Sequence, residues 1–272
     1  MAASPQINVE AVGISSEALD LRVRLADGAE TSVYVAVHAL HRTEIRVVQF
    51  PRPVALHAWC QETGLGEALV GGFFTRPDGE PLGELWIGGE RLPSVPFMEP
   101  WDGARSCLSV RAGEVALAPR EELPERPAGD LLQAGPLLVR DGRALVRPGL
   151  DTEGFSAGQA QFDSDITDGR YPRAALGIAA GVVLAVACDG RSDIDCGLTL
   201  TELANLMVTL GAHDAINLDG GGSTSLVRGG RLVNRPREEH GLELAAGRPI
   251  STALVFAPRG GVVQSSRYRE RT

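Results

Sequence analysis

The chain lacks an uninterrupted apolar run of about 18 residues, the length that a membrane-spanning helix needs. Its first residues, Met1 to Pro5, lack the basic start and apolar centre of a signal peptide. These two absences predict a cytoplasmic protein without a membrane partner. Basic residues are also in deficit, because 26 lysines and arginines stand against 35 acidic residues, a net charge of −9. This balance argues against a nucleic-acid partner.

Cysteine is scarce as well, and the sequence contains only four: Cys60, Cys107, Cys188 and Cys196. Their spacing fits neither a metal site nor a disulfide framework, so free thiols are expected, with a Cys188–Cys196 disulfide as the less favoured alternative. No metal or cofactor motif is present. Asp163, Asp165 and Asp168 lie close together but lack the glycine and glutamate of an EF-hand loop, which favours a solvated acidic loop.

What is present is the composition of a globular protein: 272 residues, of which 43% are hydrophobic and 22% charged. Apolar and polar residues alternate from 7 to 50, and a turn at 26–29 divides two of the predicted strands. A strand over 44–50 is expected to stop at Pro51. Residues 54–63 predict a short helix that Gly64 closes.

Further along, residues 75–130 are rich in proline and glycine and predict irregular β structure, whereas 130–142 predict a buried strand and a turn. Residues 147–170 predict a long loop of the kind that forms functional lids. The final third contains the clearest pattern, with predicted strands at 182–188, 215–218 and 250–256.

Between the first two of these strands, Thr199 and Glu202 have the spacing of a capping box. Apolar residues follow them at helical intervals as far as Gly211. The elements together predict an α+β fold with a mixed, β-rich sheet core and a few helices. We expect one domain over residues 1–257 and a disordered basic tail over 258–272.

Two of the predicted strands end in an aspartate followed by a glycine, at Asp189-Gly190 and Asp219-Gly220. If these strands are neighbours, both carboxylates emerge at one edge of a sheet. Paired acids suit glycosidic or phosphoester chemistry, in which one moves a proton and the other stabilises charge. The alternative is that Asp-Gly forms ordinary turns, and the residues after Asp219 favour the functional interpretation.

Those residues are three consecutive glycines and two hydroxyl residues: Gly220, Gly221, Gly222, Ser223 and Thr224. Ordering three glycines is entropically costly, which indicates a backbone that must approach a ligand closely. Their N–H groups could form a nest of donors around a phosphate or a sugar hydroxyl. Asn217 shares a face of its strand with Asp219, because alternate residues point the same way.

These motifs resemble those of the phosphodiester glycosidase family, and they fall in that family's order over roughly residues 30–257. The matching segments are 71–74 (Gly-Gly-Phe-Phe), 173–177 (Arg-Ala-Ala-Leu-Gly), 189–191 (Asp-Gly-Arg), 197–200 (Gly-Leu-Thr-Leu), 217–223 (Asn-Leu-Asp-Gly-Gly-Gly-Ser) and 249–252 (Pro-Ile-Ser-Thr). The resemblance implies hydrolysis of the bond between an anomeric carbon and a phosphodiester oxygen. The products would be free sugar and a phosphomonoester.

The resemblance also implies site residues, with a small sugar phosphodiester as partner. Asp189 and Asp219 would be the acid pair, and Arg173 and Arg191 would hold the phosphate. Glu202 is a further catalytic candidate, although the capping box explains it equally well. Arg173 has an alternative too, because it can pair with an aspartate of the preceding loop. The predicted substrate-binding residues are Gly71, Gly72, Arg191, Thr199, Asn217, Gly220, Gly221, Gly222, Ser223 and Thr224.

One position departs from the family pattern, since Val70 stands where the family usually has asparagine before Gly-Gly-Phe. A catalytically silent carbohydrate- or phosphate-binding module is therefore an alternative, and so is a hydrolase of another sugar phosphate or nucleotide derivative. The predicted location favours an intracellular small-molecule or natural-product intermediate as substrate. No motif fixes the oligomeric state, and a homo-oligomer stays open.

Overall fold

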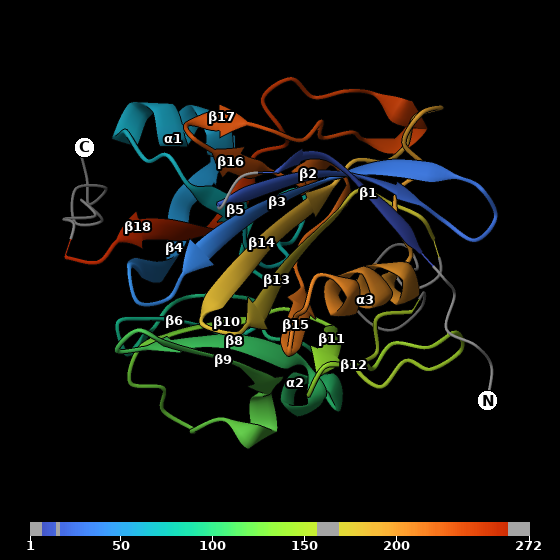
Figure 1. Cartoon of the computed structure of the whole chain (residues 1–272). Helices are drawn as coiled ribbons and strands as arrows, with labels where there is room; N and C mark the ends of the chain where they lie inside the picture. Colours follow the sequence, from blue (N-terminus) through green and yellow to red (C-terminus); the bar gives the residue numbers. More distant parts are fainter. Residues whose placement is uncertain (1–6, 15–16, 157–168, 261–272) are drawn as a thin grey trace.

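The computed structural model describes residues 7–14, 17–156 and 169–260, which form three antiparallel sheets and three α-helices (Figure 1). The largest sheet has eight strands, in the order β1 (Asn8–Ile14), β2 (Ala18–Arg24), β3 (Glu30–Ala39), β14 (Val182–Cys188), β13 (Arg173–Ala179), β15 (Asp214–Asn217), β11 (Leu137–Arg140) and β12 (Arg143–Ala144). The predicted β-rich α+β core is therefore present, and the named strands pair antiparallel throughout the described residues.

The two other sheets have five strands each. One has the order β7 (Glu90–Arg91), β6 (Leu85–Ile87), β10 (Asp130–Gln133), β8 (Ser106–Arg111) and β9 (Glu114–Pro119). The other has the order β17 (Arg231–Leu232), β16 (Leu226–Arg228), β5 (Ala68–Val70), β18 (Ile250–Pro258) and β4 (Thr43–Val54). The helices are α1 (Leu56–Thr63), α2 (Trp101–Ala104) and α3 (Leu200–Thr209).

The large sheet is buried on both faces, which explains the unbroken apolar sequence of its central strands. Along β13, Ala174 and Leu176 face a core that they share with the two smaller sheets. The intervening Ala175 faces a second core, which contains the apolar side of α3. This alternation follows the period of two along a strand. Figure 1 shows α3 beside β15, and α3 also packs against β11 and β12.

Helix α3 begins at the predicted capping box. Thr199 Oγ1 accepts a hydrogen bond from the Glu202 amide at 3.1 Å, and a Glu202 carboxylate oxygen accepts from the Thr199 amide at 2.9 Å. Gly211 ends the helix with a φ of 84°, a conformation that glycine adopts readily. Gly64 ends α1 in the same way.

Two strand predictions need correction. Strand β4 does not stop at Pro51 but continues to Val54, and its partner β18 changes register between Ile250 and Thr252, which accommodates the extra residues. The predicted strand over 130–142 is two strands, β10 and β11, because the chain turns at Gly135-Pro136 and passes from one sheet to another.

The two strands that end in Asp-Gly are not neighbours, since β13 lies between β14 and β15. Both pair antiparallel with β13, so they run in the same direction and end at the same edge of the sheet. Strand β13 begins at this edge with Arg173, which lies opposite Cys188. The topology thus brings Asp189, Arg173 and Asp219 to one end of three adjacent strands.

All four cysteines are free thiols, so the alternative of a Cys188–Cys196 disulfide is wrong. None of the helices in the described ranges combines the length and apolar character needed to cross a bilayer. Asp163, Asp165, Asp168, most of the predicted 147–170 loop and most of the predicted basic tail lie outside the described residues.

Candidate active site

A cleft of about 460 Å³ opens where β13 begins and β15 ends. It combines an apolar side with a strongly charged one, which contains arginines and carboxylates. The lining residues are Phe73, Phe74, Thr75, Arg76, Leu82, Val95, Tyr171, Arg173, Arg191, Asn217, Leu218, Asp219, Gly220, Gly221, Glu238, Glu239 and Arg248.

Asp219 is the carboxylate at the end of β15 and lines this cleft. Its amide donates to the carbonyl of Gly71 at 3.1 Å, and a carboxylate oxygen accepts from the Gly220 amide at 2.9 Å. Burial raises the pKa of Asp219 above its usual value of 3.8, against the opposing effects of a Ser223 hydrogen bond and the charge of Arg248. Asp219 is therefore a more basic carboxylate than an exposed aspartate.

A second carboxylate in the cleft, Glu238, has the opposite electrostatic environment. Arg248 Nε donates to Glu238 Oε1 at 2.6 Å, and Arg248 Nη2 pairs with Glu238 Oε2. This two-point ion pair holds the pKa of Glu238 below its usual range. Arg248 Nη1 also donates to the Ser223 hydroxyl at 3.4 Å. The network links Glu238 through Arg248 and Ser223 to Asp219, and its carboxylates have pKa values shifted in opposite directions.

Arg173 and Arg191 line the cleft around the ring of Tyr171. Their guanidinium carbons lie 5.1 and 5.2 Å from the ring centroid, within the range of cation–π contacts. Arg173 is 3% exposed, and its guanidinium donates to the carbonyls of Leu198 at 2.9 Å and Gly169 at 2.8 Å. Arg191 donates to the Arg237 carbonyl at 3.1 Å, and burial lowers its pKa.

Sequence reasoning predicted Arg173 and Arg191 but missed two other arginines of the cleft, Arg76 and Arg248, and the carboxylates Glu238 and Glu239. Arg76 follows the Gly-Gly-Phe-Phe motif by two residues and is exposed at the rim. The other three lie in the segment 238–248, which has no apolar periodicity. The only feature of the sequence that could have indicated these residues is the density of charge in that segment, as in the run Arg237-Glu238-Glu239.

Asn217 also lines the cleft and is 1% exposed. Its Nδ2 donates to the carbonyl of Gly135 at 2.9 Å, which fixes the orientation of the amide. Its Oδ1 has no hydrogen-bond partner among the described residues. A buried acceptor without a partner is costly, so a hydroxyl donor from a ligand would be favourable at this position.

Most amides of the predicted nest of donors are already bonded within the protein. The amides of Gly220, Gly221 and Ser223 donate to the Asp219 carboxylate and to the carbonyls of Pro172 and Gly220 respectively, and the Thr224 amide donates to the carbonyl of Gly221. The glycines serve close packing instead. A β-carbon on Gly220 would lie 2.9 Å from the Pro172 carbonyl, and one on Gly222 would lie 2.7 Å from Glu238 Oε1.

Gly71 and Gly72 pack beneath the cleft and are not among its lining residues. A β-carbon on Gly71 would lie 2.5 Å from Thr252 Oγ1, and the Gly72 amide donates to that hydroxyl at 3.0 Å. The Gly71 carbonyl accepts from the Asp219 amide, so this segment holds the backbone of Asp219 in position. Val70 is fully buried in the main core and makes no part of the cleft wall.

Asp189 is not among the residues that line the cleft. It is 1% exposed, and its carboxylate accepts from the Arg235 amide at 2.6 Å and hydrogen-bonds the Tyr34 hydroxyl at 3.3 Å. Burial raises the pKa of Asp189 to about 6. The structure thus places this aspartate behind the cleft wall, where it ties the 234–238 segment to β3 and the end of β14.

Five further predicted residues are not among those that line the cleft: Thr199, Glu202, Gly222, Ser223 and Thr224. Glu202 completes the capping box and pairs with Arg170 at 2.6 Å, so the structural alternative explains it. Thr199 is the N-cap itself. Thr224 is fully buried, and its hydroxyl does not line the cleft. The alternative partner for Arg173 was an aspartate of the preceding loop. Of these aspartates, Asp151 accepts from the amides of Phe155 and Ser156, and Asp163, Asp165 and Asp168 lie outside the described residues.

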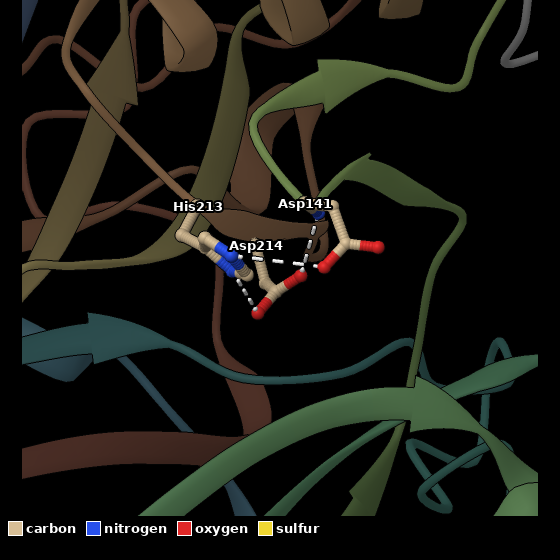
Figure 2. A group of neighbouring side chains, drawn as sticks. All are labelled: Asp141, His213 and Asp214. Carbon is tan, nitrogen blue, oxygen red and sulfur yellow. Dashed lines mark hydrogen bonds and ion pairs between the residues drawn. The ribbon is translucent and has the colours of Figure 1, made fainter.

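One group of possible metal ligands occurs in the described part of the chain, at the opposite end of β15 from the cleft. It consists of Asp141, His213 and Asp214, whose ligand atoms lie within 4.8 Å of one another (Figure 2). His213 Nδ1 lies 2.9 Å from Asp214 Oδ2, and His213 Nε2 lies 3.6 Å from Asp141 Oδ1. Each ring nitrogen faces a carboxylate, and Asp214 raises the pKa of the imidazole, which favours an exposed imidazolium ion pair.

Comparisons with known proteins identify the family of the chain. The family model described as phosphodiester glycosidase matches residues 63–257, and the chain therefore belongs to the phosphodiester glycosidase family, a family of hydrolases. N-acetylglucosamine-1-phosphodiester alpha-N-acetylglucosaminidase from Bos taurus is 27% identical over 191 residues, which cover 69% of this chain and 36% of that protein. The Homo sapiens protein of the same name is 29% identical over 175 residues, which cover 63% and 33%. The chain thus spans about a third of the length of these relatives.

Solved structures of other proteins share the fold. The zebrafish N-acetylglucosamine-1-phosphodiester alpha-N-acetylglucosaminidase catalytic domain, auto-inhibited by its pro-peptide, aligns with a TM-score of 0.68 and 18% identity over 94% of this chain and 89% of that one. A hypothetical protein from Synechocystis aligns with a TM-score of 0.61 and 18% identity over 93% and 64%. At this identity the likeness establishes the fold alone.

Proposed function

We propose that this protein hydrolyses the glycosidic bond of a sugar-1-phosphodiester, with N-acetylglucosamine as the sugar suggested by the names of its relatives. The observation that carries the proposal is that Asp219 and Glu238 line one cleft together with several arginines. Burial raises the pKa of Asp219 and Arg248 lowers that of Glu238. Two carboxyl groups whose pKa values are shifted apart are suited to different roles, one in proton transfer and one in charge stabilisation.

The arginines suit the phosphodiester group. Cleavage between the anomeric carbon and the bridging oxygen leaves both electrons of that bond on the phosphate, which departs as a phosphomonoester. Arg191 and Arg76 line the cleft and would neutralise this charge, while the Tyr171 ring and the Arg237 carbonyl hold Arg191 in position. A phosphate is a good leaving group, so little acid assistance is required.

The two carboxylates have different roles, one in proton transfer and one in charge stabilisation. Asp219, the more basic group, takes the proton of the water whose oxygen bonds to the anomeric carbon. Glu238 stays ionised beside Arg248 and stabilises the positive charge that develops on the sugar. The unpartnered Oδ1 of Asn217 accepts a hydrogen bond from a sugar hydroxyl. Asp189 supports the wall that carries Glu238 and does not touch the substrate.

The test is incubation with methyl α-N-acetylglucosamine-1-phosphodiester, followed by phosphorus NMR and sugar analysis, with Asp219→Asn as the control. Free N-acetylglucosamine and methyl phosphate are expected. Release of inorganic phosphate would favour a hydrolase of another sugar phosphate. Binding by calorimetry without any product would favour a silent module, although Val70, which motivated that alternative, lies in the core. An intracellular small-molecule substrate and a cytoplasmic location stay predictions.

A further inference from the structure

The cleft has two chemically different walls. Residues 171–173, 191, 217–221 and 238–248 supply the guanidinium, carboxylate and amide groups. The other wall comes from the chain after Gly72 and contains Phe73, Phe74, Leu82 and Val95, together with Thr75 and the exposed Arg76. Phe74 and Val95 are half-buried, so part of each side chain is open to the cleft, whereas Phe73 and Leu82 are 7% and 3% exposed.

The apolar wall is held in place by its backbone. Phe74 pairs with Pro81, Leu82 pairs with Val95, and the Leu82 amide donates to the Phe73 carbonyl at 2.8 Å. The Val95 amide donates to the Pro81 carbonyl at the same distance. These contacts place Phe74 and Val95 on either side of the Pro81-Leu82 segment and hold the backbone of both.

An aromatic cluster lies behind this wall. Phe73 and Leu82 pack with Phe97 and Phe155 in an apolar cluster separate from the two main cores. The Arg105 guanidinium lies between the rings of Phe97 and Phe155, at 4.1 and 4.3 Å from their centroids. A wall that is packed from behind in this way keeps its shape when the cleft is empty, which lowers the entropic cost of binding.

A sugar-1-phosphodiester has three parts, and the polar wall suits two of them. Asn217 and the carboxylates can bind sugar hydroxyls, and the arginines can bind the phosphate. The third part, the group esterified to the far side of the phosphate, is left for the apolar wall. Arg76 comes from the same segment as that wall, and its charge acts on Asp219 and Glu238. A hydroxyl-rich group placed on Phe74 and Val95 would lose water without gaining hydrogen bonds there.

We propose that the aglycone side of the substrate is an apolar group, such as an alkyl or prenyl chain, which packs on Phe74 and Val95. This inference rests on the proposed function, because it assigns the third part of the same substrate. It names a substrate class that differs from a phosphodiester joining two sugars.

The experiment compares methyl, butyl and octyl esters of N-acetylglucosamine-1-phosphate. The alkyl phosphates that leave have closely similar acidity, so differences in kcat/KM report contact with the chain rather than leaving-group chemistry. A fully buried methylene corresponds to about fourfold in affinity. Because the wall is partly open, we expect a rise of about tenfold from methyl to butyl and a smaller further rise to octyl.

Phe74→Ala is expected to reduce the octyl-to-methyl ratio of kcat/KM by about tenfold. Met98→Ala is the matched control, since Met98 is 53% exposed and does not line the cleft, and it is expected to leave the ratio unchanged. A ratio near one in the unaltered protein would overturn the inference while leaving the proposed function intact. An equal loss for all three esters in Phe74→Ala would also overturn it, because the wall would then contact the sugar.

Failure of the proposed function has a different signature, which is the absence of turnover with every ester. In that case the inference is tested by calorimetric binding of the same three esters. Tighter binding with a longer chain, lost in Phe74→Ala, would uphold the apolar contact. Equal binding would overturn it.

Discussion

Replacing Asp219 with asparagine removes the proposed base and keeps almost the same shape. The amide oxygen of an asparagine can still accept from the Gly220 amide, which donates to Asp219 at 2.9 Å. Positioned acid–base catalysis contributes about 10²- to 10⁴-fold. We therefore expect kcat of Asp219→Asn to fall by that factor, which corresponds to about 3 to 5 kcal/mol in the activation barrier.

Stability should respond differently. Burial raises the pKa of Asp219 in the folded protein, so ionisation of this carboxyl opposes folding. The protonated carboxyl therefore contributes to stability at low pH, and this contribution is lost as the pH rises above 3.8. The asparagine variant carries no such penalty, so its melting temperature at pH 7 should equal or exceed that of the unaltered protein.

The assay combines sugar release from the methyl ester with a thermal melt at pH 4 and pH 7. If Asp219 is the base, the activity of the unaltered protein also declines on the acid side as the carboxylate gains a proton. Turnover within threefold of normal in a folded Asp219→Asn variant would refute the assignment. A large loss of melting temperature would refute the account of its burial.

Two further substitutions test Asp189 and Thr199, which were predicted as site residues but do not line the cleft. The stability of Asp189→Asn relative to the unaltered protein should increase as the pH rises from 4 to 7, by up to about 3 kcal/mol in denaturant unfolding. The reason is that ionisation of an aspartate with a pKa of about 6 opposes folding. A larger relative stability at pH 4 than at pH 7 would contradict this. Thr199→Ala should lower the free energy of unfolding by about 0.5 to 2 kcal/mol through loss of the N-cap, while kcat/KM stays within threefold. A hundredfold loss of kcat/KM in a folded variant would show that Thr199 contacts the substrate.

The secondary structure was predictable where local rules decide it. The capping box of Thr199 and Glu202 requires only residues three apart, and the turn between β2 and β3 requires only its own sequence. Strand β4 was predicted too short, because the change of register that accommodates Pro51 depends on β18, about 200 residues away. The division of 130–142 between two sheets likewise depends on distant partners.

The site was predictable only where its residues belong to compact sequence motifs. Asp219 and Arg191 belong to compact motifs, and the structure brings both to the cleft. Asp189 belongs to an equally good motif, yet its carboxylate is buried in contact with Tyr34 and the Arg235 amide and does not line the cleft. Glu238 gains its role from its ion pair with Arg248, and a pair of charges in an irregular segment has no distinguishing pattern in the sequence.

The central claim is that water attacks the anomeric carbon and the glycosidic bond breaks. Hydrolysis of methyl α-N-acetylglucosamine-1-phosphodiester in ¹⁸O-labelled water tests this directly, with both products analysed by mass spectrometry immediately after a short reaction. The account predicts the label in N-acetylglucosamine, at a level above that from spontaneous exchange of the free sugar, and unlabelled methyl phosphate. Label in the phosphate product would show that a phosphorus–oxygen bond breaks instead and would contradict the proposed chemistry.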